Sequence, residues 1–166
     1  DFSTDEGMEI IDPFGNTIYK FADDEYEMNL DNGFKFYIAK NQKGDTVMGL
    51  MDENYNKITE PIYVYDPQLW AYSDLVYVVK VEDSKGVFIN CKGEEKLKID
   101  GIKYAIVCES VIIVTKEDGY QYIYDRNGNQ LSFRGYEFIQ DGIQNDYAVV
   151  NTEGDKNILV DCKGNI

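Results

Sequence analysis

Short apolar runs alternate along this chain with polar turns, and the pattern recurs about every 35 to 40 residues. Each run ends in an Asp or Asn, a Gly usually follows three residues later, and a second strand-like run begins. The runs cover residues 8–12, 49–52, 87–90, 122–125 and 158–161, and their Asp or Asn positions lie 40, 38, 35 and 36 residues apart. Self-similarity at this period is typical of propellers, solenoids and other arrays.

A second turn with a Gly lies in each period, as at Gly44 and Gly119, and a β-rich run precedes it. The segment from residue 121 to 154 contains four candidate strands, over residues 121–125, 129–134, 136–140 and 147–151. Four short antiparallel strands per unit is the blade pattern of a β-propeller. The sequence therefore predicts an all-β fold of tandem four-stranded antiparallel β-meander repeats in a propeller-like arrangement. An open, curved β-repeat array is the alternative.

The runs before the Asp or Asn are apolar at consecutive positions, as in Val87, Phe88 and Ile89. A sheet with one wet face would alternate, so continuous runs predict strands covered on both faces. We expect residues 1–166 to form a single all-β repeat domain, with about four repeats of 35–40 residues and a partial C-terminal hairpin. This arithmetic leaves open whether the repeats close into a ring, and whether the chain is cut from a longer array.

The Asp-x-x-Gly sequence has a mechanism as a hairpin turn. The Asp side chain caps local backbone N–H groups, and Gly takes the left-handed conformation that the loop requires. After Asp52 this position holds Tyr55. That turn is therefore predicted to be distorted, or to use Asn54 as its left-handed residue.

The repeated order of a β-rich run, a Gly turn, an apolar triplet and Asp-x-x-Gly resembles the bacterial WG-repeat (KWG-type) family over roughly residues 7–166. The Trp-Gly pair of that family falls four and three residues before the turn Asp, where this chain has Met48 and Gly49. The other units have different residues there, and the single tryptophan, Trp70, lies elsewhere. The resemblance implies a β-repeat architecture and, as a family tendency, a non-catalytic scaffold.

Acidic residues outnumber basic ones by 31 to 16, which gives a formal net charge of -15. This field repels phosphate backbones and anionic lipid surfaces, so nucleic acid is not expected as a partner. No apolar stretch is long enough to cross a membrane, and membrane insertion is not expected. A partner that meets the acidic surface should carry positive charge.

The chain has no His, which excludes the usual Ser-His and Cys-His nucleophile systems. Its three cysteines show no zinc-ligand spacing, and no pair of its carboxylates is distinguished for acid–base chemistry. The loop after Asp125 has oxygen ligands at alternate positions but lacks the distal Glu of a calcium loop. The acidic cluster of residues 23–31 fits a solvated loop as well as a cation site. We therefore predict no enzyme activity, no catalytic residues, no cofactor and no metal site.

One segment departs from the repeat pattern by gathering aromatic residues between Pro61 and Tyr72. The predicted ligand-binding residues are Tyr63, Tyr65, Trp70 and Tyr72. Exposed aromatic rings offer contact area at little entropic cost and are used to hold sugars and peptides. The alternative is that these rings fill the space between units.

The function expected is that of a non-catalytic repeat module that binds a protein, peptide or glycan through an extended β surface. The alternative is a structural spacer within a larger bacterial surface protein. A third class, an acidic-site hydrolase, is disfavoured by the missing His and by the lack of a distinguished carboxylate pair. The compartment is left open, with a secreted or cell-surface location favoured, and the oligomeric state is not predicted.

Overall fold

The computed structural model describes residues 8–67, 69, 73–108, 110–132, 134–139, 147–152 and 156–161. These residues form β-strands and no helix, which confirms the predicted all-β class. The described part of the chain therefore contains no helix that is long and apolar enough to span a membrane. The strands are β1 (Glu9–Ile11), β2 (Thr17–Lys20), β3 (Tyr26–Asn29), β4 (Lys35–Lys40), β5 (Thr46–Met51), β6 (Tyr63–Val64), β7 (Val76–Val79), β8 (Gly86–Ile89), β9 (Glu95–Leu97), β10 (Ile102–Val107), β11 (Val111–Lys116), β12 (Gln121–Asp125), β13 (Phe138–Ile139), β14 (Tyr147–Thr152) and β15 (Lys156–Asp161).

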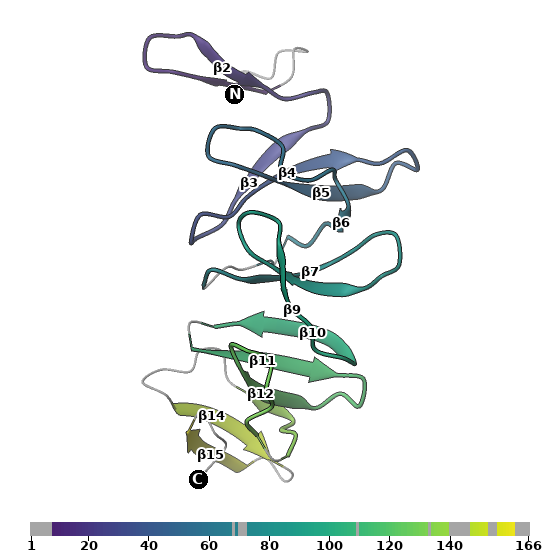
Figure 1. Cartoon of the computed structure of the whole chain (residues 1–166), viewed down its shortest axis with the longest axis vertical. Coiled ribbons are helices and arrows are strands. Elements are labelled where there is room, and N and C mark those ends of the chain that lie inside the picture. The colour runs from purple at the N-terminus through teal and green to yellow at the C-terminus, as the bar shows by residue number, and fades with distance from the viewer. Residues whose placement is uncertain are drawn as a thin grey trace.

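The strands form five small antiparallel sheets in chain order: β1-β2, β3-β4-β5-β6, β7-β8-β9, β10-β11-β12 and β13-β14-β15. Figure 1 shows these sheets one after another along the long axis, with β2 near one end and β15 near the other. None of the sheets formed by the described residues is closed. The propeller-like arrangement is therefore not confirmed.

The sheets divide the predicted strands differently from the sequence pattern. Strand β12 is the third strand of its sheet and pairs with β11, whereas β13 and β14 belong to the next sheet. Of residues 129–134, the described ones form no strand; they contact β12 through the isolated bridge between Tyr124 and Gln130 and through hydrogen bonds to the Ile123 carbonyl. The predicted strand over residues 136–140 is limited to β13, and the one over 147–151 is confirmed as β14.

The middle strands of the three inner sheets bury apolar side chains on both faces, as the consecutive apolar runs predicted, whereas Leu159 in the run of β15 is 56% exposed. In β11, Ile112 and Val114 pack toward β7 and β8, whereas Val111 and Ile113 pack toward Ile139 and Val150 of the last sheet. In β8 the exposed fractions of Val87, Phe88 and Ile89 are 4%, 1% and 0%. Each such side chain contributes about 1.5–3 kcal/mol by burial, and the layers on both sides supply that burial.

Gly49, the residue shared with the WG pattern, is required by packing rather than by a turn. It pairs directly with Tyr37 across β4 and β5, and a Cβ at this position would lie 2.5 Å from the Tyr37 ring. The ring lies flat on the strand, and its hydroxyl donates a hydrogen bond of 2.8 Å to the carbonyl of Thr59. Burial raises the pKa of Tyr37, with Glu60 and Glu25 adding to the effect.

Arg126 joins parts of the chain that are about 50 residues apart. Its Nη1 donates to Ser73 Oγ at 2.8 Å and to the carbonyl of Cys108 at 2.9 Å, and its Nη2 forms an ion pair with Asp74. The planar guanidinium group can serve all three partners at once. This contact ties the turn after β12 to the segment before β7 and to the end of β10.

Two glycines with positive φ allow the cost of backbone strain to be separated from the cost of a steric clash. Gly128 has φ +86° and a Cβ there would lie 2.6 Å from Leu97 Cδ1, whereas Gly44 has φ +85° and open space around it. We expect Gly44→Val to cost roughly 1–3 kcal/mol through backbone strain alone. Gly128→Val should cost more, because Leu97 must also move. Urea denaturation measures both; an unchanged midpoint for Gly128→Val would contradict the left-handed assignment.

Candidate functional site

The predicted aromatic binding residues do not form one exposed face among the described residues. Tyr63 is 2% exposed and belongs to the core between β5 and β7, and burial raises its pKa. Tyr65 is half-buried against the same core, and a side-chain hydrogen bond between Tyr26 and Tyr65 raises the pKa of Tyr26. Trp70 and Tyr72 lie outside the described residues. The structure thus places Tyr63 in the packing between sheets rather than on a surface.

The turns that follow the apolar runs share one hydrogen-bond pattern. In the turn after β12, Asp125 Oδ1 accepts the backbone N–H groups of Asn127 and Asn129, and its Oδ2 accepts the Asn129 amide, all at 2.8 Å. The Gly128 N–H donates to the Asp125 carbonyl at 3.1 Å. Both carboxylate oxygens are therefore occupied within the turn itself, as expected for a structural turn.

Five hairpins repeat this pattern with the two side chains in complementary pairs. The first residue is an Asp with an Asn four positions later, or an Asn with an acidic residue four positions later. The pairs are Asp12 with Asn16, Asn41 with Asp45, Asp52 with Asn56, Asn90 with Glu94, and Asp125 with Asn129. One partner is an amide in every pair, so no turn brings two carboxylates together.

The turn after Asp52 is not distorted, and Asn54 is not its left-handed residue, so both parts of that expectation are wrong. Tyr55 itself takes the left-handed conformation, with φ 65°. Its ring stacks on Tyr19, with centroids 5.4 Å apart, and the Lys35 ammonium lies 3.9 Å from its centroid. Stacking and the cation–π contact, each about 0.5–1 kcal/mol, offset a backbone cost of roughly 1–2 kcal/mol.

Two of the acidic residues between positions 23 and 31 each engage a lysine. Glu25 forms an ion pair with Lys57 at 2.7 Å, and Glu27 lies 3.8 Å from Lys35. Within the described ranges, no group of three or more Cys, Asp or Glu side chains converges as a metal site would. The absence of a metal remains a prediction from the sequence.

In two sheets, equivalent segments of the chain cover the outer edge of the strand that precedes the turn, which is β5 in one sheet and β12 in the other. The hydroxyls of Thr59 and Ser132, each seven residues after the turn's first residue, accept the N–H groups of Leu50 and Ile123 at 2.9 and 3.1 Å. Four residues further on, a Tyr pairs by its backbone with the strand: Tyr63 with Met48, and Tyr136 with Gln121. The Tyr136 and Gln121 peptide groups exchange two hydrogen bonds of 2.8 Å.

The β7-β8-β9 sheet lacks this covering segment. The residue eleven positions after Asn90 is Gly101, with φ +70°, and it pairs with no strand among the described residues. Strand β9 covers only Phe88 and Ile89, and Leu97 replaces the hydroxyl residue. Gly86 occupies the position of Met48 and Gln121, and among the described residues its outward peptide group has no hydrogen-bond partner.

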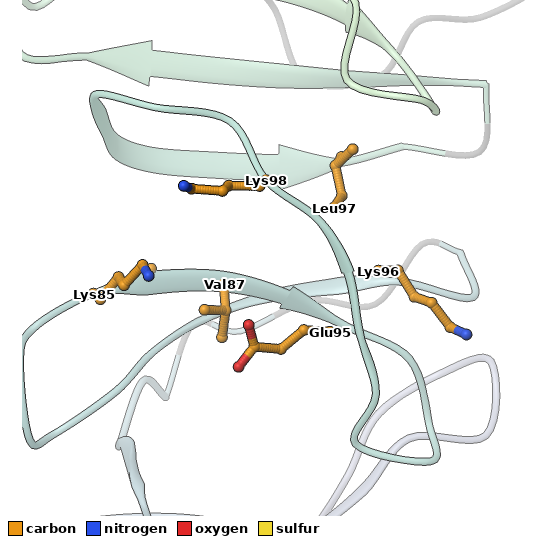
Figure 2. A pocket seen from close by; sticks show the side chains of 7 residues that line it. Lys85, Val87, Glu95, Lys96, Leu97 and Lys98 are labelled. Carbon is orange, nitrogen blue, oxygen red and sulfur yellow. The ribbon is translucent and has the colours of Figure 1, made fainter.

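A cavity of about 250 Å³ lies beside this open edge of β8. Its lining residues are Lys85, Gly86, Val87, Glu95, Lys96, Leu97 and Lys98. Figure 2 shows the ammonium groups of Lys85 and Lys98 at the same end of the gap between β8 and the segment after β9, whereas Lys96 points to the other side. The open backbone and two exposed cationic side chains therefore meet in one groove, which we name the β8 groove.

The lysines of the β8 groove differ in their partners. Glu95 accepts a hydrogen bond from Lys80 and so raises the pKa of Lys80, and Lys96 forms an ion pair with Glu94 at 2.5 Å. Lys85 and Lys98 are exposed and form no ion pair with any described residue. The groove is thus a local basic surface on a strongly acidic chain, suited to holding an anionic group and a backbone.

Sequence reasoning missed the β8 groove. The signal was present, because four lysines fall within positions 85 to 98, and Gly101 stands at the position where two other units have a Tyr. Comparisons with protein-family models, with curated proteins and with solved structures found no match for this chain. The WG-repeat resemblance therefore remains a prediction from the sequence.

The complementary turn pairs predict the outcome of a swap. Asn129→Asp should lower the thermal midpoint at neutral pH, because it places two carboxylates against each other. Adding Asp125→Asn should restore the midpoint, because the resulting pair copies Asn41 with Asp45. Differential scanning calorimetry of the three variants measures this double-mutant cycle. Additive losses without rescue would show that the amide–carboxylate pair does not hold the turn.

The turn carboxylates also predict a pH dependence. The pKa values of Asp12, Asp52 and Asp125 are held below the ordinary value, first by the side-chain amide of the paired Asn and then by backbone N–H groups. Their stabilisation is complete above the unfolded pKa of about 3.9 and is lost as the pH falls through the folded pKa. The thermal midpoint should therefore fall between about pH 5 and pH 2. The triple Asp→Asn variant should show a shallower fall; an equally steep one would contradict the assignment.

Proposed function

We propose that this chain is a non-catalytic repeat module that binds a protein, peptide or glycan partner through its extended β surface. One observation carries the proposal: β8 keeps an open backbone edge beside a basic cavity, whereas segments of the chain itself cover the corresponding edges of β5 and β12. Addition of a strand to an exposed sheet edge is a known mode of peptide recognition.

The repeat part of the proposal is supported by positions that agree in detail. Thr59 and Ser132 lie seven residues after Asp52 and Asp125, and Tyr63 and Tyr136 lie eleven residues after them, with the same hydrogen-bonding roles. The five complementary turns add to this agreement. We infer tandem β-meander units of the WG-repeat type, arranged as an open array.

A structural spacer is the second candidate function. It is favoured by the succession of sheets along the long axis, which sets β2 and β15 far apart (Figure 1). A spacer of this kind needs stable packing between sheets but no ligand. The two candidates therefore differ in whether the chain selects a partner.

The test is a selection on the whole 166-residue chain. The immobilised protein is screened against a random-peptide display library and a glycan array, at physiological and at high salt. Enrichment of related peptides or glycans supports a binding module. Selection of nothing from either library, with a cooperative thermal transition, would leave the spacer and overturn the binding function.

The aromatic segment gives a separate expectation for a selected ligand. If Trp70 contributes to the binding face, Trp70→Ala should weaken binding by about 2 kcal/mol or more, as for an aromatic hot spot. Its fluorescence should shift on titration, and it is a clean reporter because it is the sole tryptophan. Tyr63→Phe is the control, because it alters a buried ring and should leave binding unchanged. Unfolding of Trp70→Ala, or unchanged affinity, would remove Trp70 from the site.

A further inference from the structure

The peptide group of Gly86 is oriented so that it could pair with an additional β-strand. In the hairpin of β7 and β8 the Lys80 N–H donates to the Lys85 carbonyl at 2.9 Å, and the same bond joins Lys116 to Tyr120 in the hairpin of β11 and β12. The next residue in the second hairpin, Gln121, points its N–H and C=O outward to Tyr136. By the same alternation, Gly86 points its N–H and C=O into the β8 groove.

Resting on the proposed binding function, we propose that the β8 groove takes an extended peptide of a partner protein as an added β-strand. The peptide pairs by its backbone with Gly86, as Tyr63 does with Met48 and Tyr136 with Gln121, and its carboxylates meet Lys85 and Lys98. Backbone hydrogen bonds supply affinity in this recognition mode, and alternate side chains supply specificity.

The two faces of β8 define the sequence of that peptide. Gly86 and Phe88 face the apolar core shared with β10 and β11, and the Tyr77 ring covers Gly86 so closely that a Cβ there would lie 1.8 Å from its hydroxyl. Lys85, one residue earlier, faces the opposite side. An added strand therefore places an apolar residue on the side of Leu97 and, at the next position, an acidic residue on the side of Lys85.

The charges exclude a second copy of this chain paired through the same edge. In a twofold pairing of two β8 edges, the Lys85 and Lys98 side chains of both copies would gather at one seam. Like charges opposite each other on paired strands are destabilising. Lysines on an open edge prevent such self-pairing in natural sheets, and the same two charges favour an acidic strand.

The probe is a fluorescein-labelled peptide that alternates Glu and Val, with blocked termini and seven residues. Fluorescence anisotropy with the whole chain should show saturable binding. A peptide with Lys in place of Glu, and one N-methylated at its central Val, should not bind, because they lose the charge match and a backbone donor. Amide hydrogen exchange adds a direct readout: the Gly86 N–H should become protected when the Glu-Val peptide is bound.

The protein variants separate the groove from general charge. Lys85→Ser with Lys98→Ser should weaken binding about fivefold, as expected for two partly exposed ion pairs. Lys43→Ser with Lys92→Ser is the control, because it removes the same total charge from exposed turn positions outside the cavity and should leave affinity unchanged. Both variants keep the core residues and the paired Asn and acidic side chains of the turns, so both should melt as the parent does.

The outcomes are distinct. Binding of the N-methylated peptide, equal losses in both double variants, or no protection of Gly86 would each overturn strand addition. A lack of saturable binding of the Glu-Val peptide would also overturn strand addition. Self-association of the Lys85→Ser, Lys98→Ser variant without peptide would show that the two lysines serve only to prevent pairing between copies of the chain. A ligand from the library screen that is insensitive to the groove variants would leave the binding function standing and move it elsewhere; an empty screen would overturn the function itself.

Discussion

Each of the three inner sheets depends on the sheets on either side of it, because its middle strands carry apolar side chains on both faces. Phe36 and Ile38 of β4 pack toward β7, while Tyr37 and Ala39 pack toward β2. A two- or three-stranded sheet alone has too little buried surface to be stable in water. The hydrogen bonds of a sheet therefore form only together with the layers that cover it, and the stability of each unit is shared with its neighbours.

The turns, in contrast, satisfy the hydrogen bonds of their first side chain locally. Asp12, Asp52 and Asp125 each have both carboxylate oxygens bound to groups of their own turn, and none needs a neighbour or an ion. This local closure permits variation at the left-handed position. Tyr55 is accommodated there because its ring stacks on Tyr19 of β2 and contacts Lys35 of β4. A position that usually holds Gly therefore links two sheets.

The strands were predictable where burial alone decides them. The apolar run Val87, Phe88 and Ile89 correctly predicts a strand buried on both faces. Strand β12 has the predicted bounds. The predicted boundaries between units were wrong, because the sequence pattern grouped β12 with β13 and β14, whereas β12 pairs with β11. Which strands pair depends on the path of the chain between them, and the apolar periodicity does not specify that path. Tyr63 looked like a ligand residue from its aromatic neighbours, but its backbone pairing with Met48 holds it in the core. The β8 groove arises from a missing pairing at Gly101, and such an absence is visible only once the other sheets show what normally fills it.

The layered arrangement also determines how the molecule responds to tension. The sheets stack along the long axis, and strands such as β4, β5, β10 and β11 run across it (Figure 1). A pull along the axis loads the apolar contacts between layers rather than the ladders within them. Such contacts act over short distances, so layers separate one at a time while the hairpins they release keep their closed turns. We therefore expect the chain to lengthen in steps, with added resistance at the junction between β7 and β10–β12, where Arg126 forms an ion pair with Asp74 and hydrogen bonds to Ser73 and Cys108.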